Sequence, residues 1–308
     1  MSSTASSPIF QHPLGYLIGL EGVALMRAFA GEYDEAFTAA RLTEVKALLD
    51  TADTFGDGVA VPALAAATGY DGWAPSYDDP GNAIFGIEEP VVWPILDGLA
   101  PGVAVDAACG TGRHAEHLVA SGHDVHGFDI SPGMLEVARA KVPGARFSTA
   151  DVTELPLADS SVDLVVCALA LAHIENLGAV FAEFARILRP GGQLVISDTR
   201  GQFVGSGRYP LVKRALDGRF GYLPTWRHET SDYLRSSLPL GFEVLDCQEP
   251  RREAGSGDLG TATPPAPQEP PDIWDLMAWA PAATVAAYRD TPALIVWHFR
   301  LKATSAAS

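Results

Sequence analysis

Two glycines and an aspartate lie close together in the segment Asp106-Ala107-Ala108-Cys109-Gly110-Thr111-Gly112. An apolar run precedes this segment and a helical stretch follows it, so the segment is predicted to be a strand-to-helix loop. Glycines in such a loop let the backbone approach a ligand, and the N-terminus of the following helix faces that ligand. Gly110 to Ala115 also fits the dinucleotide pattern G-x-G-x-x-G/A, with Asp129 19 residues after Gly110. The segment predicts a nucleoside site without selecting the nucleoside.

Three aspartates, Asp106, Asp129 and Asp151, end three successive predicted strands. The carboxyl ends of parallel strands meet at one edge of a sheet, so these side chains are expected to point into one crevice. A carboxylate in a poorly solvated cleft repels a pyrophosphate, whereas it attracts a ligand that carries an ammonium and a sulfonium. The charges therefore favour S-adenosylmethionine (SAM) over NAD.

Short apolar runs alternate with helical stretches from residue 103 onward, which predicts βαβ units and a parallel sheet. The expected strands are Val103–Asp106, Val125–Asp129, Ala145–Asp151, Val162–Leu169, Gln193–Thr199, Gly241–Gln248 and Ala293–Leu301. Ser131-Pro132 favours a helix start, and Arg189-Pro190-Gly191-Gly192 favours a helix stop before a strand. The core is expected over residues 76–200, with its last two strands in residues 241–308.

The other segments are expected to be attachments to this core. Apolar residues at helical spacing between His12 and Tyr70 predict a helical cap over residues 1–75, and a loop rich in Gly, Pro and Asp is expected between Gly69 and Pro94. Residues 201–240 are irregular, which indicates a lid over the acceptor. Prolines predict an extended connector over residues 251–272, followed by a helix around Trp274–Tyr288.

Five segments, in order and spacing, resemble the class I SAM-dependent methyltransferases, particularly the small-molecule branch related to ubiquinone and tocopherol biosynthesis enzymes. They are Val105–Gly112, Gly127–Ser131, Ala150–Val152 with Leu155-Pro156, Asp163–Val166 and Leu188–Gly192. The resemblance implies an α/β fold with a Rossmann-like, mostly parallel seven-stranded sheet whose last strand is antiparallel. It also implies SAM as cofactor and in-line methyl transfer to a small molecule, a secondary metabolite or a quinone- or phenol-like compound.

The resemblance further implies which residues hold the methionine portion of SAM. By position, Asp106, Ala108, Gly110 and Gly112 would line it, and backbone atoms near Ala168 would face its ammonium group. Ala108 stands where relatives commonly have glycine. Alanine is tolerated there if the backbone keeps an ordinary conformation.

The nucleoside portion is assigned in the same way. Asp129 would bind both ribose hydroxyls, because a carboxylate suits two adjacent donors. Ile130 and Met134 would flank the adenine. Asp151 would accept from its exocyclic amine, and the Val152 backbone N–H would serve a ring nitrogen.

Histidines are the candidates for a general base, if the acceptor needs one. Ala172-His173 stands where relatives often have two histidines, so His173 is one candidate and His228 is another. His173 is as well explained as a residue that packs or hydrogen-bonds within the fold, and His228 is better explained as an ordinary surface or lid residue. Tyr77, just before the core, resembles a tyrosine that closes over the cofactor in relatives.

Charge and composition limit the partners. The net charge of −17 repels polyanions, so nucleic acid is not an expected substrate. No apolar run approaches the ~20 residues of a membrane-spanning helix, and the first residues lack the basic start of a signal peptide, so a cytoplasmic protein without a membrane partner is expected. The three cysteines lack the spacing of a zinc site, and no metal is expected. The oligomeric state is left open.

Three other functions remain open from the residues alone. A protein of this fold could use SAM for a rearrangement or cyclisation without methyl transfer. The glycine loop alone also fits an NAD(P)-dependent oxidoreductase, which the position of Asp106 disfavours. A module that senses SAM is the third, although the sequence contains no DNA-reading helix or basic patch.

Overall fold

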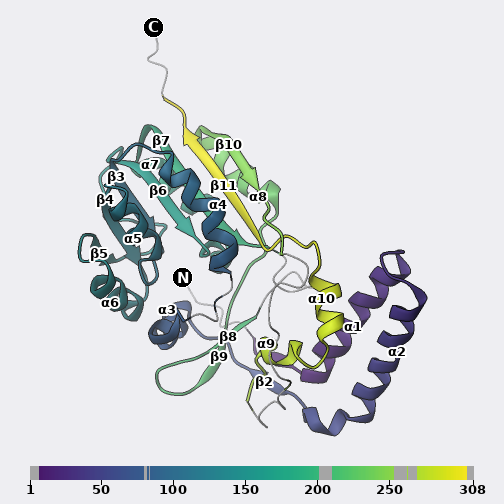
Figure 1. Ribbon diagram of the computed structural model, residues 1–308. Helices are drawn as coiled ribbons and strands as arrows, with labels where there is room; N and C mark the ends of the chain where they lie inside the picture. Colours follow the sequence, from purple (N-terminus) through teal and green to yellow (C-terminus); the bar gives the residue numbers. More distant parts are fainter. Residues whose placement is uncertain are drawn as a thin grey trace.

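A seven-stranded sheet of order β10-β11-β7-β6-β3-β4-β5 forms the centre of the computed structural model, which describes residues 7–79, 82, 84–200, 210–252, 262 and 269–303 (Figure 1). The strands are β3 (Val103–Ala107), β4 (Asp124–Asp129), β5 (Arg146–Thr149), β6 (Val162–Ala168), β7 (Leu188–Thr199), β10 (Phe242–Gln248) and β11 (Leu294–Leu301). β11 is antiparallel to both of its neighbours, and the pairings from β5 through β7 are parallel. The predicted α/β sheet with an antiparallel last strand is confirmed.

Helices cover both faces of this sheet, because the apolar side chains of its inner strands alternate between the two faces. Val105 and Val165 pack on the face covered by α7 and α8, whereas Ala104 and Leu164 pack on the face covered by α4 and α5. The helices of the core are α4 (Phe85–Asp97), α5 (Arg113–Ala120), α6 (Pro132–Lys141), α7 (Leu177–Ile187) and α8 (Thr230–Ser237).

Two local expectations about the core are wrong. β7 begins at Leu188 rather than Gln193, because Val162 pairs with Leu188 and the next pair is Leu164 with Gln193, so the Pro-Gly-Gly segment is a bulge inside the strand. The expected loop between Gly69 and Pro94 contains the end of α3 (Ala66–Trp73) and most of α4. Burial of Val92 and Leu96 against the sheet keeps α4 helical despite its internal prolines.

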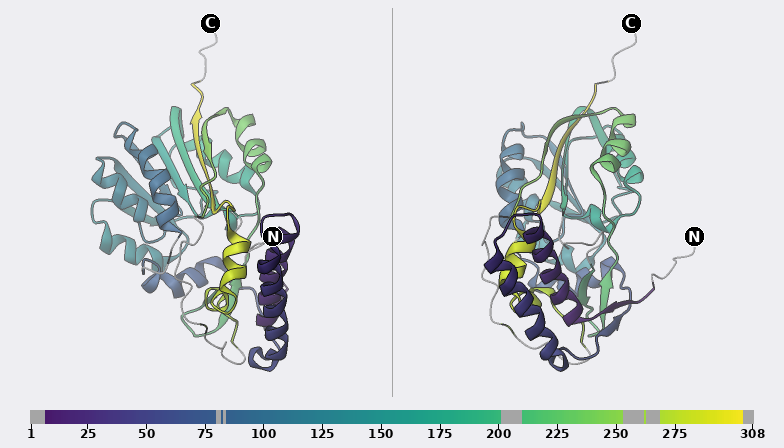
Figure 2. Two further views of the ribbon diagram at one scale, coloured as in Figure 1. Left: turned by 45° about the vertical axis from the view of Figure 1, so that its right-hand side comes forward. Right: turned by 90° about the vertical axis from the view of Figure 1, so that its right-hand side faces the viewer.

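Four helices form a separate cap, which Figures 1 and 2 show as a body apart from the sheet. They are α1 (Pro13–Phe29), α2 (Glu35–Asp50), α9 (Ile273–Met277) and α10 (Pro281–Tyr288). They share one apolar core that includes Leu17 and Ala283. Residues from both ends of the chain therefore build the cap, and the single helix expected around Trp274–Tyr288 is two helices.

The cap joins the sheet at the edge where the candidate site lies. α10 leads into β11, whose first residue, Leu294, pairs with Thr199 at the carboxyl end of β7. The structure also contains two antiparallel strand pairs outside the seven-stranded sheet, which the sequence did not predict. They are β1 (Ile9–Gln11) with β2 (Val59–Val61), and β8 (Leu211–Arg214) with β9 (Phe220–Leu223).

The described part of residues 201–240 divides into two. The β8–β9 hairpin contacts the segment after β2, since the Leu64 N–H donates to the Tyr222 carbonyl at 2.8 Å and the Tyr222 N–H donates to the Pro62 carbonyl at 2.9 Å. By contrast, α8 packs against α7 on the sheet. Residues 201–209, and most of the proline-rich connector at 251–272, lie outside the described residues. Within the described ranges, no helix has the length and apolar character needed to cross a membrane.

Candidate functional site

The loop after β3 turns tightly and contacts the end of β4. The Cys109 N–H donates to the Phe128 carbonyl at 2.8 Å, and the Gly110 N–H donates to the Asp129 carboxylate at 2.9 Å. Gly112 has φ = +82°, and a Cβ there would lie 3.2 Å from the Ala138 Cβ. At Gly110 the nearest atom to an added Cβ would be 4.0 Å away. Gly112 is thus required by the turn, and the backbone at Gly110 is open to a ligand.

Two residues with side chains hold left-handed backbone conformations at the same edge of the sheet. Ala108 and Leu169 both have φ = +56°, so the condition under which alanine would be tolerated at position 108, an ordinary backbone conformation, is not met. The conformation costs a non-glycine residue about 1–2 kcal/mol. The two residues follow the neighbouring parallel strands β3 and β6. Strained backbone of this kind clusters at ligand sites.

Asp106 lies beneath the loop. Its side chain is 1% exposed, and its Oδ2 accepts the Ala115 N–H of α5 at 2.9 Å. Burial raises the pKa of Asp106 to about 6, although His114 and the Ala115 N–H oppose that rise. The carboxylate therefore anchors the loop to the first turns of α5.

Asp129 and Ile130 lie at the end of β4 and combine a carboxylate with an exposed apolar surface. The Asp129 oxygens accept the N–H groups of Gly110 and Ser131 at 2.9 and 2.8 Å, and the Ile130 N–H also bonds to the carboxylate, so these three donors leave one lone pair for a ligand. Burial raises the pKa of Asp129 despite these donors. Ile130 is 41% exposed, whereas Met134, the other expected adenine neighbour, is buried in α6.

The remaining expected contacts follow the next strands. Asp151, after β5, is exposed, and its Oδ1 accepts from the backbone N–H and the hydroxyl of Thr153 at 2.9 and 2.7 Å. Val152 is buried. Ala168 ends β6 and is partly exposed. Together with the glycine loop and Asp129, these residues lie along one edge of the sheet, as predicted.

An aromatic cluster stands beside the glycine loop. The ring of Tyr77 lies 4.7 Å from that of Trp73, 5.6 Å from that of Phe85 and 6.2 Å from that of Tyr70. Burial raises the pKa of Tyr77. The cluster brings the Tyr77 ring beside Gly110, since its Cε1 would lie 4.0 Å from a Cβ added there.

His173 is held at both ring nitrogens. Its Nδ1 lies 3.1 Å from the Pro224 carbonyl oxygen, which can only accept, so Nδ1 carries the hydrogen. Its Nε2 then accepts the Tyr70 hydroxyl at 2.8 Å. Burial lowers the pKa of His173 and keeps the imidazole neutral. Tyr70 was not singled out by the sequence, because this contact joins residues 103 positions apart.

His228 is placed differently. Its Nε2 donates to the carbonyl oxygens of Leu171 and Ile174, at 3.1 and 2.8 Å, and so holds the turn that carries His173. The structure gives His228 a positioning contact and does not bring its ring to that of His173. Nearby Asp198, also missed by the sequence, ends β7 and accepts the Tyr233 hydroxyl at 2.6 Å.

A second buried network supports the loop from the other face. Glu88 of α4 bonds to His114 at 3.0 Å, to the Ser197 hydroxyl at 2.6 Å and to Arg113 at 2.6 Å. Burial alone would raise the pKa of Glu88, but these partners outweigh it and lower the pKa to about 2. The network fixes the start of α5 against the sheet.

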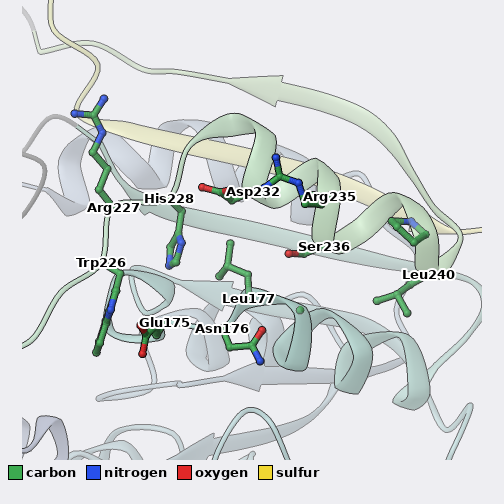
Figure 3. A pocket seen from close by; sticks show the side chains of 12 residues that line it. Glu175, Asn176, Leu177, Trp226, Arg227, His228, Asp232, Arg235, Ser236 and Leu240 are labelled. Atoms are coloured by element: carbon green, nitrogen blue, oxygen red, sulfur yellow. Dashed lines mark hydrogen bonds and ion pairs between the residues drawn. The ribbon is translucent and has the colours of Figure 1, made fainter. Parts of the chain in front are cut away.

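A cavity of about 640 Å³ opens elsewhere, between the start of α7 and α8 (Figure 3). Of its charged lining residues, Arg235 pairs with Asp232 at 3.1 Å and Arg227 pairs with Glu229 at 3.0 Å, and Glu175 lines it as well. His228 lines it, but the glycine loop does not. In the ranges that the structure describes, no group of three or more His, Cys, Asp or Glu side chains could hold a metal ion.

Comparison with known sequences identifies residues 105–196 as a methyltransferase domain. The chain is 35% identical, over 134 residues, to a demethylmenaquinone methyltransferase of Renibacterium salmoninarum, covering 42% of this chain and 56% of that protein. It is 38% identical, over 95 residues, to a malonyl-(acyl-carrier protein) O-methyltransferase of Yersinia pestis, covering 31% and 36%. The chain thus matches little more than half of the length of the first relative, and less of the second.

Solved structures share the fold. A complex of DhpI with S-adenosylhomocysteine (SAH) superposes with a TM-score of 0.52 at 17% identity, covering 76% of this chain and 93% of that one. The cyclase SpnF superposes with the same TM-score at 19% identity, covering 79% and 98%. At such identities the likeness concerns the fold alone.

Proposed function

We propose that this chain, which belongs to the class I SAM-dependent methyltransferases, transfers the methyl group of SAM to a small-molecule acceptor. The observation that supports this most strongly is the edge formed by Gly110, Asp129 and Ile130. There an open backbone, a carboxylate with a free lone pair and an exposed apolar side chain lie side by side. This donor set fits a nucleoside.

The residues along that edge would hold the cofactor as follows. Asp129 would accept the ribose hydroxyls, and Ile130 and Met134 would flank the adenine. Asp151 and the Val152 N–H would bond the edge of the base. These roles fit the exposed carboxylate of Asp151 and the exposed side chain of Ile130, whereas Met134 would act from within α6.

The glycine loop would hold the rest of the cofactor. Ala108, Gly110 and Gly112 would line the methionine portion opposite Ala168, while Asp106 would act through the loop that it anchors. Tyr77 would cover the site. When bound, SAM supplies a methyl group activated by its sulfonium charge, so this chain contributes chiefly alignment and exclusion of water.

The acceptor class is proposed from the relatives and from the cap. Proteins named demethylmenaquinone and malonyl-(acyl-carrier protein) O-methyltransferases match this chain, which supports a quinone-, phenol- or carboxylate-bearing acceptor. The cap and the β8–β9 hairpin lie at the cofactor edge and would select it. We propose domain roles from the sequence bounds as the fold modifies them: the cap takes α1 and α2 of residues 1–75 together with α9 and α10 of 241–308, residues 76–200 form the SAM-binding core, residues 201–240 form the acceptor segment, and β10 and β11 of 241–308 are the final strands.

The alternatives are weaker. SpnF, which shares the fold, is named a cyclase and so represents the non-methylating alternative, but the matched sequence relatives are named as methyltransferases. That match also disfavours an NAD(P)-dependent oxidoreductase. We propose a cytoplasmic enzyme without a nucleic-acid partner, and the net charge of −17 supports the absence of a nucleic-acid partner because it repels polyanions.

The direct test uses methyl-labelled SAM with panels of phenols, quinols and carboxylic acids. We expect SAH and a labelled product to accumulate in equal amounts with at least one acceptor. If SAM binds but no panel member yields SAH, methyl transfer to these classes is refuted. If calorimetry detects NAD binding and no SAM binding, the cofactor assignment fails as well.

Replacing Asp129 tests the cofactor site itself. Asp129→Asn removes the charge that strengthens the ribose hydrogen bonds, so SAM affinity should fall by about 30- to 100-fold, as expected for bonds to a charged group. Asp124→Asn is the matched control, because Asp124 begins the same strand at the opposite edge and is exposed. Equal affinities for the two variants would refute the role of Asp129.

A further inference from the structure

The hydrogen bond between Tyr70 and His173 carries an inference that rests on the proposed function and deepens it. It joins the last turn of α3 to the turn after β6, with 2.8 Å between the Tyr70 hydroxyl and Nε2. The rings meet edge to face, with centroids 5.4 Å apart. This geometry aligns a hydroxyl proton with an imidazole lone pair.

Tyr70 is placed in the crevice by its own helix. Asp71, the next residue, accepts the Ser131 hydroxyl at 2.5 Å and the Gly133 N–H at 2.9 Å, which docks α3 on the start of α6. Burial, with the nearby charges of Asp129 and Asp198, raises the pKa of Tyr70 well above its usual range. Tyr70 therefore lies beside the start of α6, where its hydroxyl feels the charges of Asp129 and Asp198 at the carboxyl ends of β4 and β7.

The two side chains have complementary protonation. Tyr70 stays protonated, so it donates a hydrogen bond and does not act as a phenolate. His173 is neutral, with Nδ1–H directed to the Pro224 carbonyl. That carbonyl would stabilise the imidazolium formed when Nε2 takes a proton, as an orienting acceptor does for other catalytic histidines.

We propose that Tyr70 and His173 form a proton relay, and that the acceptor is an un-ionised hydroxyl compound. The acceptor O–H proton passes to the Tyr70 oxygen while the Tyr70 proton passes to His173 Nε2. The acceptor oxygen takes the methyl group, so the S–CH₃ bond breaks, its electron pair stays on sulfur, and a C–O bond forms. The imidazolium then returns its proton to solvent. Tyr70 touches the acceptor, and His173 acts through Tyr70.

The test compares two phenols on the full-length protein. 4-Methylphenol is un-ionised near neutral pH and needs its proton removed, whereas 4-nitrophenol above neutral pH is already ionised. Tyr70→Phe and His173→Asn should each lower kcat for 4-methylphenol by about 100-fold, should lower 4-nitrophenol turnover by a much smaller factor, and should retain SAM affinity. The double variant should lose no more than either single variant, because the two groups act as a unit.

A pH profile gives a second readout that a structural role would not move. Because burial lowers the pKa of His173 below 6.5, wild-type turnover of 4-methylphenol should fall on an acidic limb below that pH. The limb should vanish in His173→Asn. Tyr16→Phe is the control and should behave as the wild type, because the Tyr16 hydroxyl lies in the cap, near the Tyr288 hydroxyl.

Several outcomes would overturn the relay. Equal losses for both phenols would mean that Tyr70 only positions α3, and unchanged turnover of 4-methylphenol would mean that the pair is not used. If SAM binds but neither phenol is methylated while a carboxylic acid is, the hydroxyl class is wrong and the methyltransferase function stands. If SAM does not bind, the proposed function fails, and the relay fails with it.

Discussion

The sheet core and the helical cap each bury a glutamate, and the two glutamates are treated in opposite ways. Glu88, in the core, is surrounded by His114, Arg113 and the Ser197 hydroxyl, and its pKa is lowered to about 2. Glu21, in the cap, has Arg41 at 3.0 Å, and burial raises its pKa to about 7. The core therefore holds a fully compensated charge beneath the cofactor loop, whereas the cap holds a poorly compensated one.

The two regions also differ in how they are assembled. The sheet core builds its cofactor edge from consecutive βαβ units, whereas the cap needs α1 and α2 from one end of the chain and α9 and α10 from the other. Arg27 of α1 reinforces that union by donating to the Ala286 carbonyl of α10 at 2.8 Å. We interpret the core as the rigid cofactor platform and the cap as the separately stabilised region that shapes the acceptor site.

The largest effect is expected from a cavity in the cap. Leu17→Ala removes a fully buried side chain of α1 and should cost about 2–5 kcal/mol of stability. Native-state hydrogen exchange should show lost protection in α1 and α10, with β3 and β6 unchanged and SAM affinity retained. Acceptor turnover should fall.

Leu118→Ala is the matched change in the core, since Leu118 is equally buried on α5. It should lower the protection of β3 and weaken SAM binding. If both variants reduce protection across the whole molecule alike, cap and core form one cooperative unit and the contrast between them is wrong.

The next largest effect is expected on the pH dependence of folding stability. Because the pKa of Glu21 is raised in the folded state, its contribution to stability is present below the unfolded value of 4.5 and is lost as the pH rises to about 7, by about 3 kcal/mol at most. For Glu88 the direction is reversed, and stability is lost as the pH falls from 4.5 to about 2. Cap and core are thus expected to weaken at opposite ends of the pH range.

Urea denaturation of Glu21→Gln at pH 4.5 and pH 7.5 checks this contrast. The variant cannot ionise at position 21, so its stability relative to the wild type should rise with pH. Glu35→Gln, at the exposed start of α2, is the control and should show no such trend. A relative stability of Glu21→Gln that falls with pH would contradict the raised pKa.

The smallest effect is expected at the loop. Ala108→Gly relieves a left-handed alanine and should stabilise the core by up to about 1 kcal/mol, after the entropy cost of glycine is subtracted. Ala107→Gly, in the buried strand β3, should destabilise it by about as much. Thermal unfolding distinguishes the two, and equal destabilisation would mean that Ala108 is unstrained.

Sequence reasoning succeeded where the signal was local. The strands of the core and the loop from Asp106 to Gly112 follow from alternating apolar runs and from glycine spacing, and both were found. The left-handed backbone conformation of Ala108 was not predicted, because an alanine in a sequence gives no sign that the fold forces it into the left-handed region.

Contacts between residues far apart in the sequence were not predicted either. Tyr70 meets His173 across 103 residues, and Arg27 meets Ala286 across 259. No periodicity or spacing in the sequence relates such pairs. The sequence therefore predicted the cap only as an N-terminal helical attachment. It assigned α9 and α10 to a helix of the core that follows the proline-rich connector.

The most direct test of the account is hydrogen exchange of the wild-type protein with and without SAM. We expect new protection at 108–112, 129–134 and 150–153, little change in α1 and α2, and no protection by NAD. Protection confined to the cavity between α7 and α8, at residues 175–178 and 226–240, would contradict the assignment of the cofactor to the carboxyl edge of the sheet.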